Sequence, residues 1–382
     1  MSASPPDEGL RVPTQDQVLE VLADVEDPEI NKPITELGMV DEIAIEGSTV
    51  GVRIKLTIPG CPLKDTIQRD VTNAVQQLEG VEQVQVAFGS MTDAERQEMS
   101  AGLRAEAGSG NPEMDISFAK PDSQTKVIAV ASGKGGVGKS SVTANLAAAL
   151  ASQGHRVGVL DADIWGYSIP RMMGVEGKPV AFEGMVMPLQ AHGCKVISIG
   201  FFTDPDRSVI WRGPMLHRAL QQFLADVYWG ELDFLLCDLP PGTGDIAISL
   251  AQMLPNADMV VVTTPQQAAQ KVALRAGKAT EQTGMKVAGV IENMAGFTDP
   301  ASGEVHDIFG SGGGEELATA LETQVLGRIP IDPRVVEASD AGVPLVVSHP
   351  DLPASQAMIE VATQLAARKG SVVGRSLPLS VG

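Results

Sequence analysis

Cysteine is scarce in this sequence, and the few cysteines are far apart. The 382 residues contain three, Cys61, Cys194 and Cys237, and no two of them form a CxxC pair. So few cysteines cannot build a disulfide framework in a chain of this length, and their spacing excludes a zinc finger. The fold must therefore depend on a hydrophobic core, which 43% apolar residues can supply.

Long apolar runs and an excess of basic residues are also missing. No apolar run reaches the roughly 18 residues that a membrane-spanning helix needs, and the first residues lack the basic and apolar regions of a secretory signal. The 48 acidic residues outnumber the 28 basic ones, and the resulting net charge of −20 repels polyanions such as DNA. We therefore expect a cytoplasmic protein without a membrane or nucleic-acid partner.

Residues 1–94 have the apolar pattern of a small α+β domain. Helical spacing of apolar residues predicts helices over 14–25 and 64–79, and alternating apolar residues predict strands over 49–58 and 81–88. Residues 95–122 are polar and become rich in Gly, Ser, Asp and Pro, which favours a short charged helix followed by a linker.

The remainder of the chain, residues 123–382, consists of short apolar runs separated by helical stretches. The runs do not alternate with polar residues, which indicates strands buried on both faces of a sheet. They are VIAVAS, RVGVL, FLLC, MVVVTT, KVAGVI and QVLGRI. We predict an α/β domain with a mainly parallel sheet and helices on both faces, whose ligand binds at the carboxyl ends of the strands.

A phosphate-binding loop of the form G-x-x-x-x-G-K-[ST] lies between the first of these strands and a helix. Its glycines allow backbone N–H groups to surround a polyphosphate, and the N-terminus of the helix adds partial positive charge. Lys139 would reach the β and γ phosphates, and the hydroxyl of Ser140 would bind Mg²⁺. The predicted nucleotide-binding residues of the loop are Gly133, Lys134, Gly135, Gly136, Val137, Gly138, Lys139, Ser140 and Ser141.

Carboxylates follow two other strands at the same edge of the sheet. Asp161 and Asp163 end RVGVLDAD, and Asp238 ends FLLCD, with Asp245 beyond a Pro-Pro-Gly turn. A carboxylate beside a phosphate loop can bind Mg²⁺ or position the attacking water. We predict that Asp238 binds Mg²⁺ and that Asp163 orients the water. Either aspartate could instead cap the helix that follows it.

The loop carries a second lysine, Lys134. GKGGVGKS resembles the deviant phosphate loop of the superfamily of MinD, ParA, the arsenite pump and nitrogenase reductase, in which the early lysine reaches the nucleotide of a partner subunit. The resemblance implies a homodimer that closes on ATP and in which Lys134 acts in trans. An additional cation would also stabilise the phosphoryl transition state on general grounds. Alternatively, Lys134 is a solvated loop lysine.

Further stretches are similar to the Mrp/ApbC type of iron-sulfur cluster carrier ATPase, which is often preceded by a small domain of the iron-sulfur assembly type. The resemblance implies an ATP hydrolase that delivers clusters to apoproteins. It also implies that Asn293 hydrogen-bonds the adenine and that the loop from Pro330 to Asp332 lines it, although Asn293 could instead satisfy a turn. The stretches are LDADIWGYSIPRMMG, VIWRGPM, DLPPGTGD, VTTPQQAA, VIENMAGF, IFGSGGG and GRIPIDPRV, with DPEINKPITELGMV and IPGCPL in the first domain.

The sequence departs from that pattern where the carriers have their CPxC ligands, because Asp299 and Ser302 stand at those positions. Fe–S clusters are bound by thiolates. Cys61 is the candidate replacement, since a cysteine near a helix N-terminus favours the thiolate, although it could also be a small buried residue. Cys237 is expected in the core, and Cys194 is expected to have no role in binding.

Other functions compatible with the sequence are a spatial switch of the MinD or ParA kind, an electron-donating reductase, and an ATP-sensing scaffold that recruits assembly partners without carrying a cluster. The C-terminal ARKGSVVGRSLPLSVG is not the basic amphipathic helix of a membrane-surface protein, which disfavours the membrane switch. The missing CPxC disfavours the reductase and favours the scaffold. Iron-sulfur delivery driven by Mg·ATP is the leading hypothesis.

Overall fold

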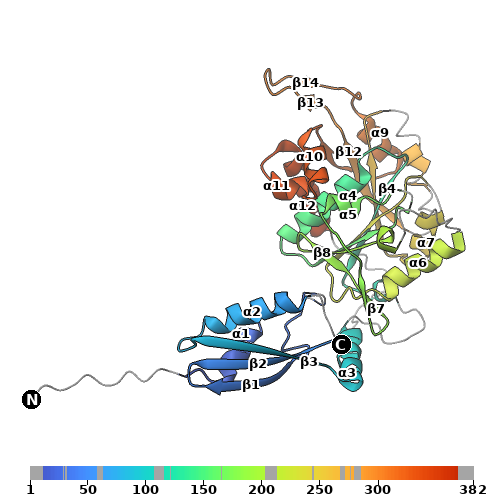
Figure 1. Ribbon diagram of the computed structural model, residues 1–382. Coiled ribbons are helices and arrows are strands. Elements are labelled where there is room, and N and C mark those ends of the chain that lie inside the picture. Colours follow the sequence, from blue (N-terminus) through green and yellow to red (C-terminus); the bar gives the residue numbers. More distant parts are fainter. Residues whose placement is uncertain are drawn as a thin grey trace, which may run out of the picture. The chain divides into compact units, whose positions relative to one another are not determined.

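The computed structural model (Figure 1) divides along the chain into two compact units, Met1–Ala105 and Glu106–Gly382. The domain boundaries expected at residues 94 and 122 stay a prediction. The structure describes residues 12–28, 30, 32–57, 63–106, 116–120, 122–164, 166–202, 213–242, 245–266, 272–275, 277–278 and 285–368.

The first unit is a three-stranded sheet with helices. Its strand order is β1-β2-β3, with β1 antiparallel and β3 parallel to β2. The predicted helices and strands are present with ends shifted by a few residues, and α1 starts with a capping box between Thr14 and Gln17. The elements are α1 (Gln15–Leu22), β1 (Val40–Glu46), β2 (Thr49–Leu56), α2 (Lys64–Gln76), β3 (Gln83–Ser90) and α3 (Asp93–Glu106).

Apolar alternation explains why the first unit folds in this way. Val50, Val52 and Ile54 of β2 are at most 1% exposed, and Ile67 and Val71 of α2 are equally buried. Burying a side chain of this size stabilises the folded state by about 1.5–3 kcal/mol. The crossover from β2 through α2 to β3 returns the chain parallel to β2, as a connection that contains a helix allows.

The second unit contains an eight-stranded sheet, and it confirms the predicted mainly parallel architecture. The six apolar runs form six adjacent parallel strands, from β15 to β5 in the spatial order below. The strands β9 and β8 extend the sheet beyond β5, and only β8 is antiparallel. In spatial order the strands are β15 (Val325–Ile329), β12 (Lys286–Asn293), β11 (Asp258–Thr263), β4 (Lys126–Ser132), β10 (Phe234–Asp238), β5 (Val157–Asp161), β9 (Cys194–Ser198) and β8 (Leu189–Ala191).

Helices cover both faces of this sheet (Figure 1). Ile128 and Val130 of β4 pack into one core with α4, α5 and α10 to α12, whereas Val127 and Ala129 pack into the other with α6, α7 and α9. This alternation along one strand is the reason why the apolar runs are continuous. The helices are α4 (Lys139–Ser152), α5 (Ile169–Met172), α6 (Gly213–Ala225), α7 (Asp245–Met253), α9 (Gly313–Ala320), α10 (Arg334–Asp340), α11 (Leu345–Ser348) and α12 (Pro353–Ala367).

Smaller elements complete the described part of the second unit. Two short hairpins, β6 with β7 and β13 with β14, are both antiparallel. Within the described ranges, no helix combines the length and the apolar character that crossing a membrane requires. The small elements are η1 (Ser117–Ala119), β6 (Val180–Phe182), β7 (Met185–Met187), η2 (Ile199–Phe202), β13 (Phe297–Thr298) and β14 (Val305–His306).

Candidate nucleotide-binding site

The phosphate loop connects the end of β4 to the start of α4, as the motif predicts. Two of its glycines are required by the backbone. Gly138 precedes the helix in a left-handed conformation with φ of 80°, and a Cβ on Gly133 would lie 2.2 Å from the backbone nitrogen of Ala273. A side chain at either position would therefore strain the loop or collide with the neighbouring backbone.

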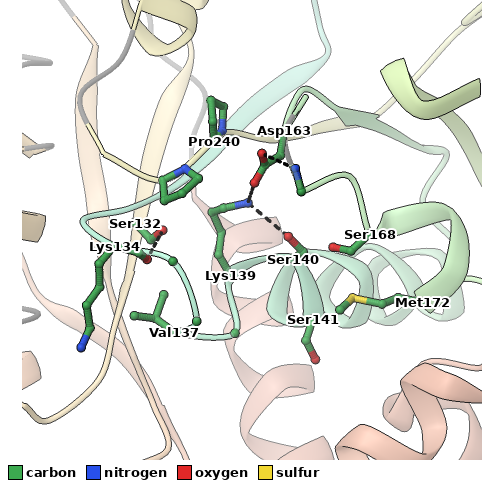
Figure 2. A pocket seen from close by; sticks show the side chains of 15 residues that line it. Ser132, Lys134, Val137, Lys139, Ser140, Ser141, Asp163, Ser168, Met172 and Pro240 are labelled. Atoms are coloured by element: carbon green, nitrogen blue, oxygen red, sulfur yellow. Dashed lines mark hydrogen bonds and ion pairs between the residues drawn. The ribbon is translucent and has the colours of Figure 1, made fainter. Parts of the chain in front are cut away.

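A cavity of about 510 Å³ lies over this loop (Figure 2). All predicted loop residues except Gly133 line it, and Asp163 does as well. The volume falls within the range of pockets that bind small molecules. The lining residues are Ser132, Lys134, Gly135, Gly136, Val137, Gly138, Lys139, Ser140, Ser141, Asp163, Gly166, Ser168, Met172, Pro240 and Pro241.

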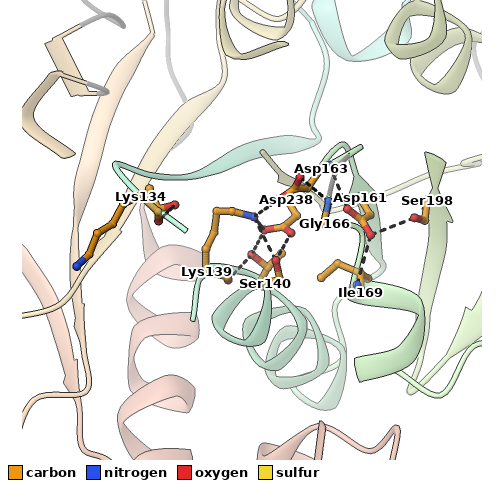
Figure 3. Close-up of polar contacts among 11 residues, drawn as sticks. Lys134, Lys139, Ser140, Asp161, Asp163, Gly166, Ile169, Ser198 and Asp238 are labelled. Carbon is orange, nitrogen blue, oxygen red and sulfur yellow. Dashed lines mark hydrogen bonds and ion pairs between the residues drawn. The ribbon is translucent and has the colours of Figure 1, made fainter. Parts of the chain in front are cut away.

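Lys139 and Asp238 form a buried ion pair at the floor of the site (Figure 3). The distance from Lys139 Nζ to Asp238 Oδ1 is 2.7 Å, and Asp238 is fully buried. Two hydroxyl groups also donate to this carboxylate, Ser140 at 2.5 Å and Thr143 at 3.0 Å. These three donors all belong to α4, and α7 begins only at Asp245. The carboxylate of Asp238 therefore faces the phosphate loop rather than capping the next helix.

Asp163 approaches the same lysine from the end of β5. Its Oδ2 lies 3.8 Å from Lys139 Nζ, and its Oδ1 accepts a hydrogen bond of 3.1 Å from the backbone N–H of Gly166. The residue before α5 is Ser168, so Asp163 closes a turn and does not cap the helix. This position beside the cavity is compatible with the predicted role in orienting water.

Asp161 is a third carboxylate at this edge, and the sequence did not indicate a role for it. It pairs in register with Asp238, is fully buried, and accepts hydrogen bonds from Ser198 Oγ and from the backbone N–H of Ile169. Burial, and then the negative charge of Asp238, raise the pKa of Asp161 to about 7. The sequence DAD places Asp161 at the end of a strand, but only the strand register shows that Asp161 and Asp238 are neighbours.

Lys134 points away from Lys139 and from the carboxylates (Figures 2 and 3). Its Nζ donates a hydrogen bond of 2.9 Å to the side-chain oxygen of Gln266, beyond the end of β11, and its backbone oxygen accepts one from Ser132 Oγ. The side chain is thus held by the protein rather than fully solvated. Its ammonium group is directed away from Lys139 and the phosphate loop of the same chain.

The predicted adenine-binding residues lie at the ends of two neighbouring strands. Asn293 ends β12 and pairs with Ile329, directly before Pro330. The side-chain nitrogen of Asn293 donates a hydrogen bond of 2.9 Å to the backbone oxygen of Val137 in the phosphate loop. Asp332 accepts hydrogen bonds from Arg334, at 2.8 and 2.7 Å. The sheet therefore brings Asn293 and Pro330 together, and contact with adenine stays a prediction.

The cysteines that the structure describes are unsuited to binding a cluster. Cys194 and Cys237 are fully buried, and burial raises the pKa of Cys194 to about 12 and that of Cys237 further. The sulfur of Cys194 donates a long hydrogen bond, 3.7 Å, to the backbone oxygen of His192. Cys61 lies outside the described residues, and within those no group of three potential metal ligands is found.

The segment that replaces CPxC forms the turn of the β13–β14 hairpin. Oδ1 of Asp299 accepts a hydrogen bond of 2.7 Å from the backbone N–H of Ala301, and Ser302 Oγ accepts one from Glu304. The backbone donors lower the pKa of Asp299. Asp299 and Ser302 therefore stabilise a turn in this chain.

Comparisons with known proteins agree with this geometry. A family model described as NUBPL iron-transfer P-loop NTPase matches residues 123–366, and one described as iron-sulfur cluster assembly protein matches residues 15–87. Relatives named iron-sulfur cluster carrier protein, from Mycobacterium leprae (strain TN) and Mycobacterium tuberculosis (strain ATCC 25618 / H37Rv), are 52% and 53% identical over 94% of this chain and 94% of their own. A solved nucleotide-binding protein from Archaeoglobus fulgidus in complex with ADP is 40% identical, with a TM-score of 0.51, over 59% of this chain and 92% of its own. The chain therefore belongs to the family of NUBPL iron-transfer P-loop NTPases.

Proposed function

We propose that this chain is a slow ATP hydrolase that acts as a homodimer in the cytoplasm and carries iron-sulfur clusters, or helps to deliver them, to client apoproteins. The observation that supports ATP hydrolysis best is the arrangement of Lys139, Ser140 and Asp238 at the start of α4, beneath a cavity lined by the phosphate loop. The names of the close relatives support the iron-sulfur cargo.

The donor set fits Mg²⁺ together with a polyphosphate. Ser140 offers a hydroxyl oxygen and Asp238 a carboxylate oxygen, which are the hard ligands that Mg²⁺ prefers. These two residues would hold Mg²⁺, which when bound neutralises charge on the β and γ phosphates. Lys139, at the start of α4, would supply positive charge to the phosphates. Asp163 would orient the water that attacks the γ phosphate.

The orientation of Lys134 supports a contribution from a partner subunit. Its ammonium group is bound by Gln266 and points away from Lys139, so it does not add a cation to its own phosphate region. A second copy of the chain that faced the site could receive this lysine. Hydrolysis would then require two subunits, and ATP would favour the closed dimer.

The scaffold alternative is favoured by the cysteines. Cys194 and Cys237 are buried, and a turn stabilised by Asp299 and Ser302 stands where the carriers have their ligands. Of the three cysteines, Cys61 alone is left as a candidate ligand. Two copies of Cys61 in a dimer, or one copy together with cysteines of a client, would have to hold the cluster.

Hydrolysis and cargo are tested separately. Lys139→Ala should abolish Mg·ATP hydrolysis, and unchanged turnover would remove the proposed site. For the cargo, the full chain is reconstituted anaerobically with iron and sulfide, and iron and sulfide are counted per dimer for the wild type, Cys61→Ala and the control Cys194→Ala. A cluster lost only in Cys61→Ala supports the carrier, whereas no cluster in any variant supports the scaffold.

A further inference from the structure

The side chain of Asn293 contacts the phosphate loop itself, which recognition of a base does not require. Its Nδ2 donates to the backbone oxygen of Val137 at 2.9 Å, across 156 positions of sequence. The next residue, Gly138, has a φ of 80°, and a Cβ there would lie 2.2 Å from Asn293 Nδ2. The amide thus occupies the space that a side chain at Gly138 would need, and it is hydrogen-bonded to the preceding peptide. The loop turn and the amide fit each other closely.

The backbone around Asn293 is fixed on the side of β15. Asn293 pairs with Ile329, and the backbone N–H of Ala295 donates to the oxygen of Ile329 at 2.9 Å. Met294, between them, has a φ of 58°, which is unfavourable for a residue with a side chain. Such a conformation persists where the surrounding structure enforces it, and it is common at binding sites.

The preceding residue holds the strand end from the opposite side. Glu292 is 2% exposed, accepts a hydrogen bond from the backbone N–H of Gly314 at the start of α9, and lies 3.6 Å from Arg328 Nε. Successive residues of a strand point to opposite faces, so Glu292 binds α9 while Asn293 binds the phosphate loop. The position of the Asn293 side chain is therefore set from both sides of β12.

We propose that Asn293 is a positioning residue of the phosphate loop, an inference that rests on the nucleotide-binding function proposed above. By holding the Val137 carbonyl, the amide stabilises the left-handed turn at Gly138, and this turn aims backbone N–H groups at the phosphates. A primary amide has two hydrogens and one oxygen, so the bond to Val137 leaves one hydrogen and the oxygen for adenine. One side chain then couples recognition of the base to recognition of the phosphates.

A ligand without a base separates the two roles of Asn293. Binding of Mg²⁺ with inorganic tripolyphosphate and of Mg²⁺ with ADP is measured by calorimetry for the full-length wild type, Asn293→Leu and Asn293→Ala. Leucine keeps the size of asparagine without its hydrogen-bonding groups, and alanine covers the case in which leucine does not fold. Asn73→Leu, the same change on the exposed face of α2, is the matched control.

Both Asn293 variants should lose affinity for tripolyphosphate by roughly three- to tenfold, the effect of one hydrogen bond. The affinity for ADP should fall by at least the same factor. Lower affinity for ADP with unchanged affinity for tripolyphosphate would show that Asn293 touches only the base, and would overturn the proposal. A wild type that binds neither ligand would instead refute the nucleotide-binding function, and this inference with it.

Discussion

Replacing Lys139 by methionine tests the buried ion pair directly. Lys139 is 6% exposed and Asp238 is fully buried, with 2.7 Å between Nζ and Oδ1. Methionine keeps most of the length of the lysine side chain but leaves the carboxylate without its cation. Removing one partner of a buried ion pair costs about 3–5 kcal/mol. Because the hydroxyls of Ser140 and Thr143 still donate to Asp238, we expect the lower end, about 3 kcal/mol.

Tryptophan fluorescence measures this loss in the second unit alone. Trp165, Trp211 and Trp229 all belong to residues 106–382, so their emission during urea unfolding does not report on the first unit. Lys178→Met makes the same change at an exposed position of the same unit and should alter the unfolding free energy by less than about 0.5 kcal/mol.

A double variant without either charge of the ion pair tests whether the two charges stabilise each other. Asp238→Asn alone leaves Lys139 as a buried cation, whereas Lys139→Met combined with Asp238→Asn removes both charges. The double variant should therefore lose less stability than the sum of the two single variants. Additive losses, or a Lys139→Met variant as stable as Lys178→Met, would refute the conclusion that Lys139 neutralises Asp238.

Two further predictions follow from the site. Lys134→Ala should bind nucleotide but not hydrolyse it. An equal mixture of Lys134→Ala and Lys139→Ala chains should recover roughly a quarter of wild-type turnover, because half of the dimers are mixed and one of the two sites in each mixed dimer is complete. No recovery in an ATPase assay would contradict action in trans. The second concerns pH. Because the folded-state pKa of Asp161 is raised from 3.8 to about 7, its contribution to stability is complete below the lower value and is lost as the pH rises through the higher one. The Asn side chain of Asp161→Asn does not titrate, so the stability of this variant relative to wild type should rise between pH 3.8 and about 7 and then level off. Urea unfolding followed by tryptophan fluorescence measures this difference in stability. A difference that does not change with pH would contradict a buried, protonated carboxyl group at Asp161.

Sequence patterns predicted the structure correctly where the residues that determine it are consecutive in the chain. The phosphate loop is one strand, one turn and one helix in succession, so its glycines, Lys139 and Ser140 could be assigned to the site from their order alone. The six apolar runs likewise predicted six parallel strands, because a strand buried on both faces has no polar alternation. The strands that were not predicted are β1, β6, β7, β8, β9, β13 and β14. In β8 the run is three residues long, too short for a pattern to stand out.

Sequence patterns could not predict contacts between residues that are far apart in the sequence. The bond between Lys134 and Gln266 spans 132 positions, and the bond between Asn293 and Val137 spans 156. Both depend on strand order, which places β11 beside β4 and β12 beside β11. The neighbouring positions of Asp161 and Asp238 depend on strand register in the same way. A pattern can indicate that a residue lies at the carboxyl edge, but only the paired sheet determines which side chain it meets.

The charges at this edge limit the form in which a nucleotide can bind. Within the described site, Asp163 and Asp238 both lie within ion-pair distance of Lys139, and Asp161 lies beside Asp238 on the neighbouring strand. Burial, and then the charge of Asp238, raise the pKa of Asp161 to about 7 and so favour its neutral form. Asp163 and Asp238 together carry one more formal negative charge than Lys139. This excess would repel a free triphosphate, whereas Mg²⁺ held by Ser140 and Asp238 would offset the charge of that carboxylate. Tight binding should therefore require Mg²⁺, and the buried aspartates would be the cause of that requirement.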